Sequence, residues 1–592
     1  MTTVPVLITG GGISGLTAAL QLAHHNIKSI VVERHPSTAH LPKAHTLNPR
    51  SMEIFRQMGI SEEMQRIAVP PKHIQKASWR SSFGGSAPYD GQILASIDTF
   101  GGGELTEQYL QASPQPYASF HQVRLEPFLA AKAQEHPLID LRFNTEVVEY
   151  EELDEQCLVT VRCRETEKIE TIQSEYVVAA DGGRFFQDRL GYEMVGLKNV
   201  GDNITLWFKA DLSEYMDDET LLTWFVTPNA FGMVSGVLVP VGAGRHSDEW
   251  VLHFGYPPGT GDEVTQDQAI DRMLDLFKIP NFEFELIKLS RWYNESVIAN
   301  RFRTGRVLST GDAIHRHVPT LGIGMNSAIG DAHNLAWKLA HVIKGYSTDS
   351  LLDTFEEERR PVVEWNAELA LQTYYLHVGI GPQLGMVPGA PESWNELALT
   401  RYVENSPRGR SRRERARQLI WGDQRLEHQA LDLELGYHYI GSAIDVDTSD
   451  PHIPDPMLNA YQPSTRPGAR LPHVWLHDCN GLRHSTLDLI GAGYTLLVSD
   501  ENSPWIAAAQ SVAPMTPAPL DVVVIHESQF RAGSEEWEQI AQLGATGALL
   551  VRPDQHIAWR TLDAHGDVES RLREAISIAS HCGALQVQTV SS

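Results

Sequence analysis

Cysteine is scarce in this chain, whose 592 residues include only Cys157, Cys163, Cys479 and Cys582. No two of them form a C-x-x-C pair, and their spacing fits neither a zinc site nor a disulfide framework. The chain also lacks an apolar run of the roughly 18 residues that a membrane-spanning helix needs. Its first apolar strand begins too early to leave room for a signal peptide. These absences predict a cytoplasmic protein.

The chain has few positively charged residues: 48 Lys and Arg against 75 Asp and Glu, which gives a formal net charge of −27. An acidic chain of this kind is not expected to bind nucleic acid or an anionic membrane. Hydrophobic residues make up 42% of the sequence, and the length is sufficient for several domains with large cores.

Glycine is concentrated where the first buried run, Val4–Thr9, ends. Gly10, Gly12 and Gly15 form a G-x-G-x-x-G pattern that opens a helical segment, and a second strand over residues 28–32 ends at Glu33. This acid lies 18 residues after the last glycine (33 − 15 = 18), near the place where a ribose hydroxyl is bound. The segment predicts an adenine dinucleotide whose diphosphate lies at the helix N-terminus.

Two further predicted buried strands are each followed by an aspartate at the carboxyl end, where ligands bind in open α/β sheets. Asp181 follows the run 176–180, and Asp312 follows the run 306–311. A glycine-rich turn after Asp312 opens a long helix over 325–343, whose first N–H groups face an electron-rich group. A flavin needs such contacts, so the dinucleotide is predicted to be FAD. No second G-x-G-x-x-G occurs, so a nicotinamide donor would bind transiently, and its identity as NADH or NADPH stays open.

Together these segments resemble the group A flavoprotein aromatic monooxygenases, which have the para-hydroxybenzoate hydroxylase fold. The resemblance covers most of residues 4–345 and is sharpest for the phenol hydroxylase and 2,4-dichlorophenol 6-monooxygenase branch. It implies an α/β fold: a Rossmann-like FAD-binding domain, an interleaved β-sheet substrate domain and a thioredoxin-like C-terminal domain without C-x-x-C. The segments that carry the resemblance to this branch are 48–55, 122–127, 311–317, 331–339, 550–554 and 559–560.

The domain boundaries follow from this resemblance and from changes in composition along the chain. The expected parts are an FAD-binding domain over 1–185 with substrate-side segments near 70–116, a β-rich substrate domain over 186–300, the second part of the FAD-binding domain with long helices over 301–400, a connecting segment over 401–450 and the thioredoxin-like domain over 451–592.

The resemblance also implies which residues bind the cofactor. The glycine turn and Glu33 would hold the ADP half, Asp312 the ribityl chain, and the amides of Gly324 and Met325 the isoalloxazine ring. Asp181 would serve both FAD and the nicotinamide donor, although the sequence after it departs from the family pattern. The residues assigned to cofactor binding are Gly10, Gly12, Ile13, Ser14, Gly15, Glu33, Arg34, Lys43, Gln122, Arg124, Asp181, Asp312, Pro319, Gly322, Gly324, Met325 and Asn326.

The implied reaction consumes NAD(P)H and O2 and hydroxylates a phenolic ring through a flavin C4a-hydroperoxide. His45 is the candidate base, because it lies five residues before Arg50 (50 − 45 = 5), where phenol hydroxylases place their substrate-side acid or base. Histidine suits the task because its ordinary pKa is about 6.5. No metal site is expected. The predicted pocket-lining aromatics in the β-rich segment are Trp207, Phe231, Trp250 and Phe254.

Alternative functions remain open at this point. One is a tailoring oxygenase for polycyclic aromatic polyketides, which would share every motif above. Another is a non-catalytic FAD-binding redox sensor, which the altered sequence after Asp181 keeps in consideration. A disulfide oxidoreductase would require the absent C-x-x-C pair. A homodimer is expected by analogy alone.

Overall fold

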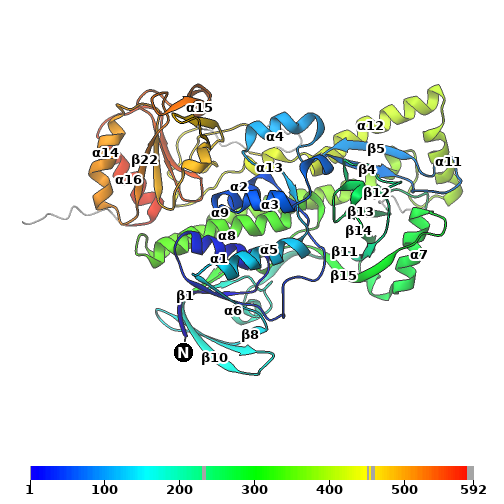
Figure 1. Cartoon of the computed structure of the whole chain (residues 1–592), viewed down its shortest axis with the longest axis horizontal. Helices are drawn as coiled ribbons and strands as arrows, with labels where there is room; N and C mark the ends of the chain where they lie inside the picture. Colours follow the sequence, from blue (N-terminus) through cyan, green and yellow to red (C-terminus); the bar gives the residue numbers. More distant parts are fainter. Residues whose placement is uncertain (1, 230–234, 450–452, 455–460, 583–592) are drawn as a thin grey trace, which may run out of the picture.

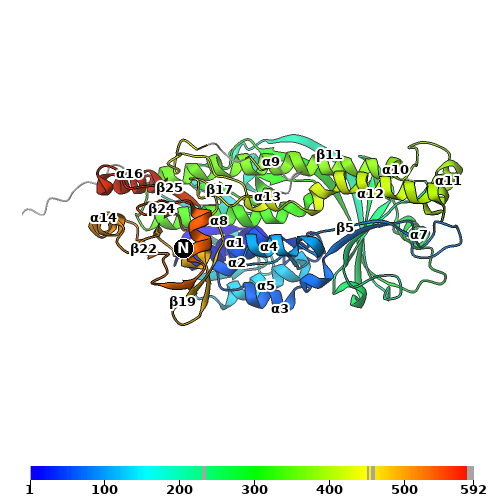
Figure 2. The ribbon, with the colours of Figure 1, turned by 90° about the horizontal axis from the view of Figure 1, so that it is seen from above.

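The computed structural model describes residues 2–229, 235–449, 453–454 and 461–582. Three parts follow one another along the molecule (Figure 1): the C-terminal domain at one end, a central α/β body, and a second sheet at the other end. The long helices α8 (Ile323–Ile343) and α9 (Thr354–Leu376) run through the central body. In the view from above, α9 and α12 (Pro407–His428) extend along one side of the molecule (Figure 2).

The central body is built on a mostly parallel sheet whose main path runs β16-β17-β10-β1-β2-β7. β1 (Thr2–Thr9) pairs in parallel with β2 (Ser29–Val32) and with β10 (Ile169–Ala179), and β10 pairs in parallel with β17 (Val307–Ser309). The central parts of these strands, such as 4–8, 30–32 and 176–179, are almost continuously apolar because both faces of a parallel sheet are covered. The other strands are β7 (Ile139–Arg142), β8 (Thr145–Glu152), β9 (Cys157–Cys163) and β16 (Arg303–Thr304).

Helix α1 (Ile13–His24) packs against both α8 and α5 (Gln122–Glu135) in the largest apolar core. Helix α2 (Pro49–Gln57) is capped by Asn48, whose side chain accepts a hydrogen bond of 2.9 Å from the Ser51 amide. Among the described residues, no helix combines the length and apolar character that a membrane crossing requires. Short elements of this body are β3 (Thr46–Leu47), α3 (Ser61–Ile67), α4 (Thr106–Ala112), β6 (Ala118–Ser119) and α6 (Phe186–Leu190).

The second sheet has the order β18-β15-β11-β14-β13-β12-β4-β5. Two of its strands precede the rest of the sheet by about a hundred residues in the chain, and one of them, β4, pairs in parallel with β12. The sheet therefore interleaves separate chain segments, as the predicted fold class requires. Its strands are β4 (Lys76–Arg80), β5 (Ile93–Asp98), β11 (Met194–Lys209), β12 (Thr220–Phe225), β13 (Gly236–Pro240), β14 (Glu249–Tyr256), β15 (Glu285–Ala299) and β18 (His315–Arg316).

The outer face of this second sheet packs against α7 (Gln266–Phe277). Trp250 and Phe254 are fully buried in that core, and the Trp250 indole N–H donates to the Ala210 carbonyl at 2.9 Å. The sequence-based assignment of these two aromatics to the substrate pocket is therefore corrected. They stabilise the packing of the sheet against α7, because their strand positions point away from the central body.

The opposite face of the sheet carries Thr205, Trp207 and His253. Thr205 is the direct cross-strand partner of His253, and Trp207 is one alternation further along the same face. Trp207 therefore lies on the face with Thr205 and His253, and its role in the substrate pocket stays a prediction. Phe231 lies outside the described residues.

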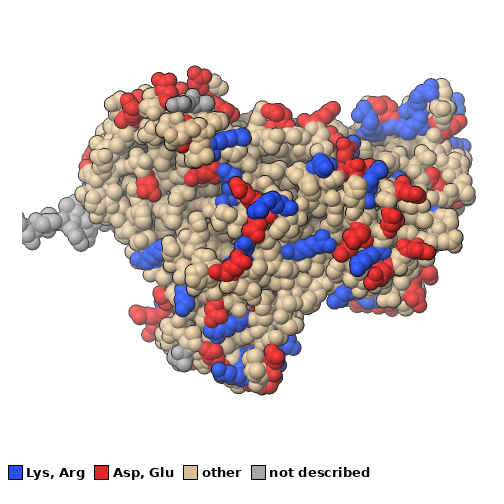
Figure 3. Space-filling model, in the orientation of Figure 1, with Lys and Arg blue, Asp and Glu red and all other residues tan. Residues whose placement is uncertain are grey.

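In the sequence, four of the described helices lie between α9 and the C-terminal domain: α10 (Ile380–Gln383), α11 (Glu392–Val403), α12 and α13 (Leu431–Leu435). Two of them, α11 and α12, lie beside the second sheet (Figure 1). Helix α12 packs against α9, α11 and β5, so the stretch predicted as a connecting segment contributes to the fold. Basic side chains gather over α12 at the upper right of the surface, whereas acidic ones are scattered (Figure 3).

The C-terminal domain contains a four-stranded sheet of order β22-β21-β24-β25. Strand β21 pairs in parallel with β22 and antiparallel with β24, and β24 pairs antiparallel with β25. This is the arrangement expected of a thioredoxin-like domain. The four cysteines of the chain are free. The elements are β19 (Trp475–Asp478), β20 (Arg483–Ser485), β21 (Tyr494–Val498), α14 (Pro504–Val512), β22 (Leu520–Val524), β23 (Phe530–Ala532), α15 (Ser534–Ala541), β24 (Ala548–Val551), β25 (Ile557–Thr561) and α16 (Val568–Ser580).

A buried group of charges joins the C-terminal domain to the central body. Arg552 donates to both carboxylate oxygens of Glu358 on α9, at 2.6 and 2.8 Å, and Lys338 on α8 donates to the same carboxylate at 2.7 Å. Arg470 likewise donates to Glu53 on α2, at 2.8 and 2.5 Å. All five side chains are at most 1% exposed. Because unpaired buried charges are costly, these pairs fix how the domains meet.

Candidate active site

Four parallel strands of the central sheet end at one edge, and their turns meet there. The Gly10 amide donates to the Val32 carbonyl at 2.8 Å, and the Ala180 amide donates to the Thr9 carbonyl at 2.8 Å. The Thr310 amide donates to the Ala179 carbonyl at 3.0 Å. The residues that follow each strand, which include Glu33, Asp181 and Asp312, therefore lie along one edge of the sheet.

The turn after β1 requires glycine. Gly10 has φ +100°, and a Cβ on it would lie 2.3 Å from the Ala180 carbonyl oxygen. A Cβ on Gly15 would lie 2.0 Å from the Gly10 carbonyl oxygen, so α1 passes directly over the turn. The N-cap residue Gly12 has no side chain to cap α1, but the Glu126 carboxyl group accepts a hydrogen bond from the Ile13 backbone, so the first turn of α1 is only partly open to a ligand. Ser14 bonds Thr310 at 3.0 Å and ties this turn to β17.

Glu33 lies at the end of β2, beside the glycine turn. One carboxylate oxygen accepts from the Gly11 amide at 2.7 Å and the other from the His35 amide at 2.9 Å. Arg34 and Lys43 are exposed on the adjoining loop. This is the position at which an acid can reach a ribose hydroxyl.

The two predicted aspartates differ in their surroundings. The Asp181 carboxylate accepts from the Gly183 amide at 3.0 Å and from the Phe185 amide at 2.8 Å, so it orders its own turn. Burial raises the pKa of Asp181. Asp312 is exposed. It lies near the turn that follows Asp181, because a Cβ built on Gly182 would be 4.0 Å from the Asp312 Cβ. Asp312 is therefore the aspartate with room to contact a ligand.

The turn before α8 brings β3 to the same edge. Gly322 has φ +62°, and a Cβ on it would lie 2.6 Å from the Thr46 hydroxyl oxygen. The Asn326 side chain donates to the Thr46 carbonyl at 3.1 Å and accepts from the Asn48 amide at 3.0 Å, so it joins α8 to the strand rather than facing outward. A Cβ on Gly324 would meet no atom within 4 Å, so the first turn of α8 has open space beside it.

Two predicted cofactor residues on α5 bond to protein groups. Gln122 donates to Glu126 at 2.6 Å, and Arg124 pairs with Glu249 on β14 at 3.3 Å. The sequence did not single out Glu126, which also lies at this site. Glu126 is 3% exposed, and its Oε1 atom lies 3.5 Å from the position of a Cβ built on Gly12. Burial raises the pKa of this carboxyl group. The spacing of Glu126 four residues after Gln122 was the available signal, because such pairs meet on one helix face.

His45 precedes β3 and therefore lies beside the α8 turn. Its carbonyl accepts from the Phe120 amide at 2.7 Å, and its ring stacks on His121 with centroids 5.1 Å apart. Burial holds the pKa of His45 well below its ordinary value, and the charges of His121 and His253 would lower it further. The structure thus places the predicted base, as a neutral imidazole, between the central body and the second sheet.

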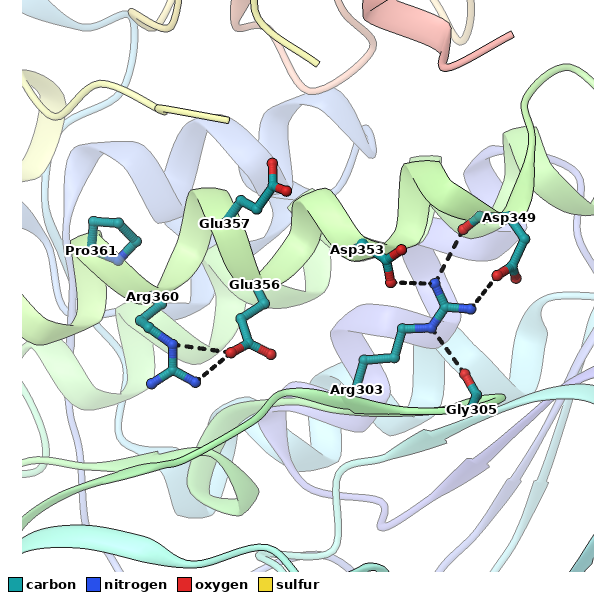
Figure 4. Close-up of a pocket in the computed structure, with 8 residues that line it drawn as sticks. All are labelled: Arg303, Gly305, Asp349, Asp353, Glu356, Glu357, Arg360 and Pro361. Carbon is teal, nitrogen blue, oxygen red and sulfur yellow. Dashed lines mark hydrogen bonds and ion pairs between the residues drawn. The ribbon is translucent and has the colours of Figure 1, made fainter. Parts of the chain in front are cut away.

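An open pocket of about 590 Å³ lies on another part of the surface (Figure 4). Arg303 bonds Asp349, and Arg360 bonds Glu356, so the cations that line the pocket already have carboxylate partners. Gly305, which also lines it, precedes β17 and thus lies at the amino end of the parallel strands. Ligands of such sheets bind at the carboxyl ends, so this pocket is not the candidate site.

The edge of the sheet fits FAD by three independent features. The glycine turn excludes a Cβ at Gly10 and Gly15 beside a helix start without an N-cap side chain, an exposed carboxylate lies at Asp312, and open space lies beside Gly324. A model of FAD-binding domains matches residues 3–370, and a model of the aromatic-ring hydroxylase C-terminal domain matches residues 464–579. The chain belongs to the FAD-dependent aromatic-ring hydroxylases. It is accordingly a flavin-dependent aromatic monooxygenase, and NAD(P)H and O2 are the typical co-substrates of this family.

Similar proteins cover the full length of the chain. The 2,4-dichlorophenol 6-monooxygenase of Delftia acidovorans is 31% identical over 97% of this chain and 98% of its own. A putative polyketide hydroxylase of Streptomyces halstedii is 29% identical over 94% of this chain and 93% of its own. The solved structure of the flavin-dependent monooxygenase PieE with FAD and substrate is 33% identical, covers 98% of this chain and 99% of its own, and has a TM-score of 0.89.

Proposed function

We propose that this hydroxylase acts on a phenolic ring and that His45 is the base that takes the hydroxyl proton. The observation that carries the proposal is the placement of a neutral His45 beside the α8 turn, facing the second sheet. A phenolate attacks an electrophilic oxygen far more readily than a phenol does, so a base at this place would accelerate the reaction. The name of the dichlorophenol relative agrees with such a substrate.

The roles of the chain's own groups follow from the site. Gly10, Gly12 and Gly15 would hold the diphosphate at α1, Asp312 the ribityl chain, and the first amides of α8 the ring system. When bound, FAD supplies the redox and oxygen-transfer chemistry. His45 would accept the substrate proton on a ring nitrogen, and the second sheet would exclude water from the reacting groups.

Polyketide-type phenols are the second candidate substrates. The identity to the polyketide hydroxylase, 29%, is close to the 31% to the dichlorophenol enzyme, so similarity alone does not choose between them. The discriminating experiment is a panel of phenol, 2,4-dichlorophenol, 1-naphthol and 1,8-dihydroxyanthraquinone, tested for stimulated NAD(P)H oxidation and for hydroxylated product. Unstimulated oxidation that yields only hydrogen peroxide with all four would refute the proposal.

His45→Ala should lower kcat/KM for the best phenol of the panel by roughly 100-fold, because general-base assistance is worth at least that factor. FAD should remain bound, since the side chain is not part of the predicted cofactor contacts. His565→Ala is the matched control: this histidine is exposed in the C-terminal domain and should leave kcat/KM unchanged. Equal kinetics for the two variants would remove His45 from the mechanism.

The pH dependence of kcat/KM should be flat between about pH 6 and 8. An imidazole whose pKa is held well below its ordinary value of 6.5 keeps its base form as the pH falls through 6.5, so no titration limb is expected there. Activity should fall only at lower pH, where His45 becomes protonated. An acidic limb with a midpoint near 6.5 would show that His45 is not held neutral.

A further inference from the structure

His253, on the face of β14 that points to the central body, has a defined tautomer. The Trp292 indole N–H, which can only donate, donates to the Thr205 hydroxyl oxygen at 2.9 Å. The Thr205 hydroxyl lies 2.7 Å from His253 Nδ1. Thr205 is 3% exposed, so its own proton needs an acceptor, and Nδ1 is the one in reach. His253 Nδ1 therefore accepts, and the remaining proton is on Nε2.

At the junction between the central body and the second sheet, His121 stacks on His45 and presents an acceptor nitrogen. The His121 Nε2–H donates to the Pro240 carbonyl at 3.0 Å, because a carbonyl can only accept, and this leaves Nδ1 of His121 without a proton. Nδ1 of His121 and Nδ1 of His45 are both buried and have no hydrogen-bond partner among the described residues. A donor N–H on His253 thus shares this junction with an unsatisfied acceptor nitrogen on His121 and an unpartnered ring nitrogen on His45.

The junction is uncharged around these three rings. Burial lowers the pKa of His121 to about 4 and that of His253 to about 4, so both are neutral at pH 7, as is His45. The charge of Arg124 on α5 also acts on His121, but this guanidinium is paired with Glu249 on β14. A carboxylate bound here would face lone pairs and no free cation, whereas a neutral hydroxyl can both donate and accept.

We propose that His253 and His45 together recognise an uncharged aromatic hydroxyl group, with His253 Nε2–H donating to its oxygen and His45 accepting its proton. His121 is a positioning residue, which holds the His45 ring by stacking. In the proton transfer the substrate O–H bond breaks, an N–H bond forms on His45, and the electron pair stays on the substrate oxygen. This inference rests on the proposed function and extends it: substrates have a free aromatic hydroxyl, not a carboxylate, at this place.

The test compares three ligands with one ring: the panel phenol that binds wild type most tightly, its methyl ether and the corresponding carboxylate. Binding to the FAD-loaded protein is followed by the flavin absorbance change. His253→Leu should weaken the phenol and the ether alike, by about 10-fold, since both oxygens accept a hydrogen bond. His45→Ala should weaken the phenol alone, because the ether has no proton to donate. Wild type should bind the carboxylate at least 10-fold more weakly than the phenol.

Matched variants separate recognition from a structural effect. His253→Gln places an amide N–H near the position of Nε2 and should restore most of the phenol affinity. Thr205→Val removes the hydroxyl that fixes the tautomer and should weaken both ligands by about threefold. Thr223→Val should match wild type, because this buried threonine is on β12, which β13 separates from β14.

Three results would overturn the inference. One is a His253→Leu variant that binds the phenol and the ether as tightly as wild type does. The others are a His253→Leu variant that loses affinity for the phenol alone, and equal affinity of wild type for the phenol and the carboxylate. Each of these could occur while wild type still hydroxylates phenols, which would leave the proposed function standing. If no phenol of the panel stimulates NAD(P)H oxidation or binds, the proposed function and the inference both fail.

Discussion

Replacing Gly15 with alanine should give a protein that no longer retains FAD on purification. The added Cβ would lie 2.0 Å from the Gly10 carbonyl oxygen, so α1 and the glycine turn cannot keep their present separation. Overpacking of this kind costs about 1–3 kcal/mol, and the displaced turn should weaken FAD binding by roughly 100-fold. Titration of the apoprotein with FAD, followed by flavin fluorescence, measures the loss.

Gly422→Ala is the control for Gly15→Ala. Gly422 also lies inside a helix, α12, but a Cβ there would meet no atom within 4 Å. This variant should bind FAD as wild type does and gain up to about 1 kcal/mol of stability, because alanine is the better helix former. Equal FAD affinity in the Gly15 and Gly422 variants would mean that the cofactor does not depend on the close approach at Gly10.

Glu358→Gln should destabilise the protein by about 3–5 kcal/mol, the largest stability change that we expect from a single polar substitution. The glutamine would leave Lys338 buried without the carboxylate that it contacts, and it would leave Arg552 paired with Asp554 alone. Urea unfolding followed by tryptophan fluorescence measures the shift. Glu364→Gln on the same helix is the control, since its partner Arg360 is 3.6 Å away and its side chain is 53% exposed, and it should change stability by less than about 1 kcal/mol.

The same carboxylate predicts how stability varies with pH. Burial alone would raise the pKa of Glu358, but the charges of Arg552 and Lys338 lower it from 4.5 to about 2. A depressed pKa contributes stability that is fully present above 4.5 and is lost as the pH falls towards 2. Wild type should lose stability over this range more steeply than Glu358→Gln. Parallel acid-unfolding curves, or equal stability of the Glu358 and Glu364 variants at pH 7, would contradict the account of the domain junction.

The nucleotide-binding half of the fold could be predicted from sequence because its signals are local. The strand, the glycine turn and α1 occupy consecutive residues, and the turn geometry at Gly10 and Gly15 allows no other residue type. The same holds for Asp312, which lies three residues after the end of the short buried strand β17. The cofactor contacts of the individual residues remain predictions.

The placement of the aromatic residues could not be predicted in the same way. Alternation along β14 shows that Trp250 and Phe254 share one face and His253 the other, but not which face meets the central body. The answer depends on α7, which follows later in the chain and covers the face with Trp250. Burial of a large aromatic in a core is the common outcome when no partner is known.

The buried charges and histidines also escaped prediction, because their partners are distant in sequence. Arg552 and Glu358 are 194 residues apart, and Glu53 and Arg470 are 417 apart. In a chain with 75 acidic residues, a single buried carboxylate has no distinguishing local pattern. His121 and His253 are likewise isolated in sequence, and only the pairing of β3 with β6 and of β11 with β14 brings them to the junction.

The most direct test of the central claim, that this chain is a flavin-dependent hydroxylase of phenolic rings, is turnover of the panel phenols with NAD(P)H under ¹⁸O₂. The account predicts a hydroxylated product that carries one labelled oxygen atom, formed in step with NAD(P)H consumption and greatly reduced in His45→Ala. NAD(P)H consumption that yields labelled hydrogen peroxide alone, with every phenol recovered unchanged, would contradict it.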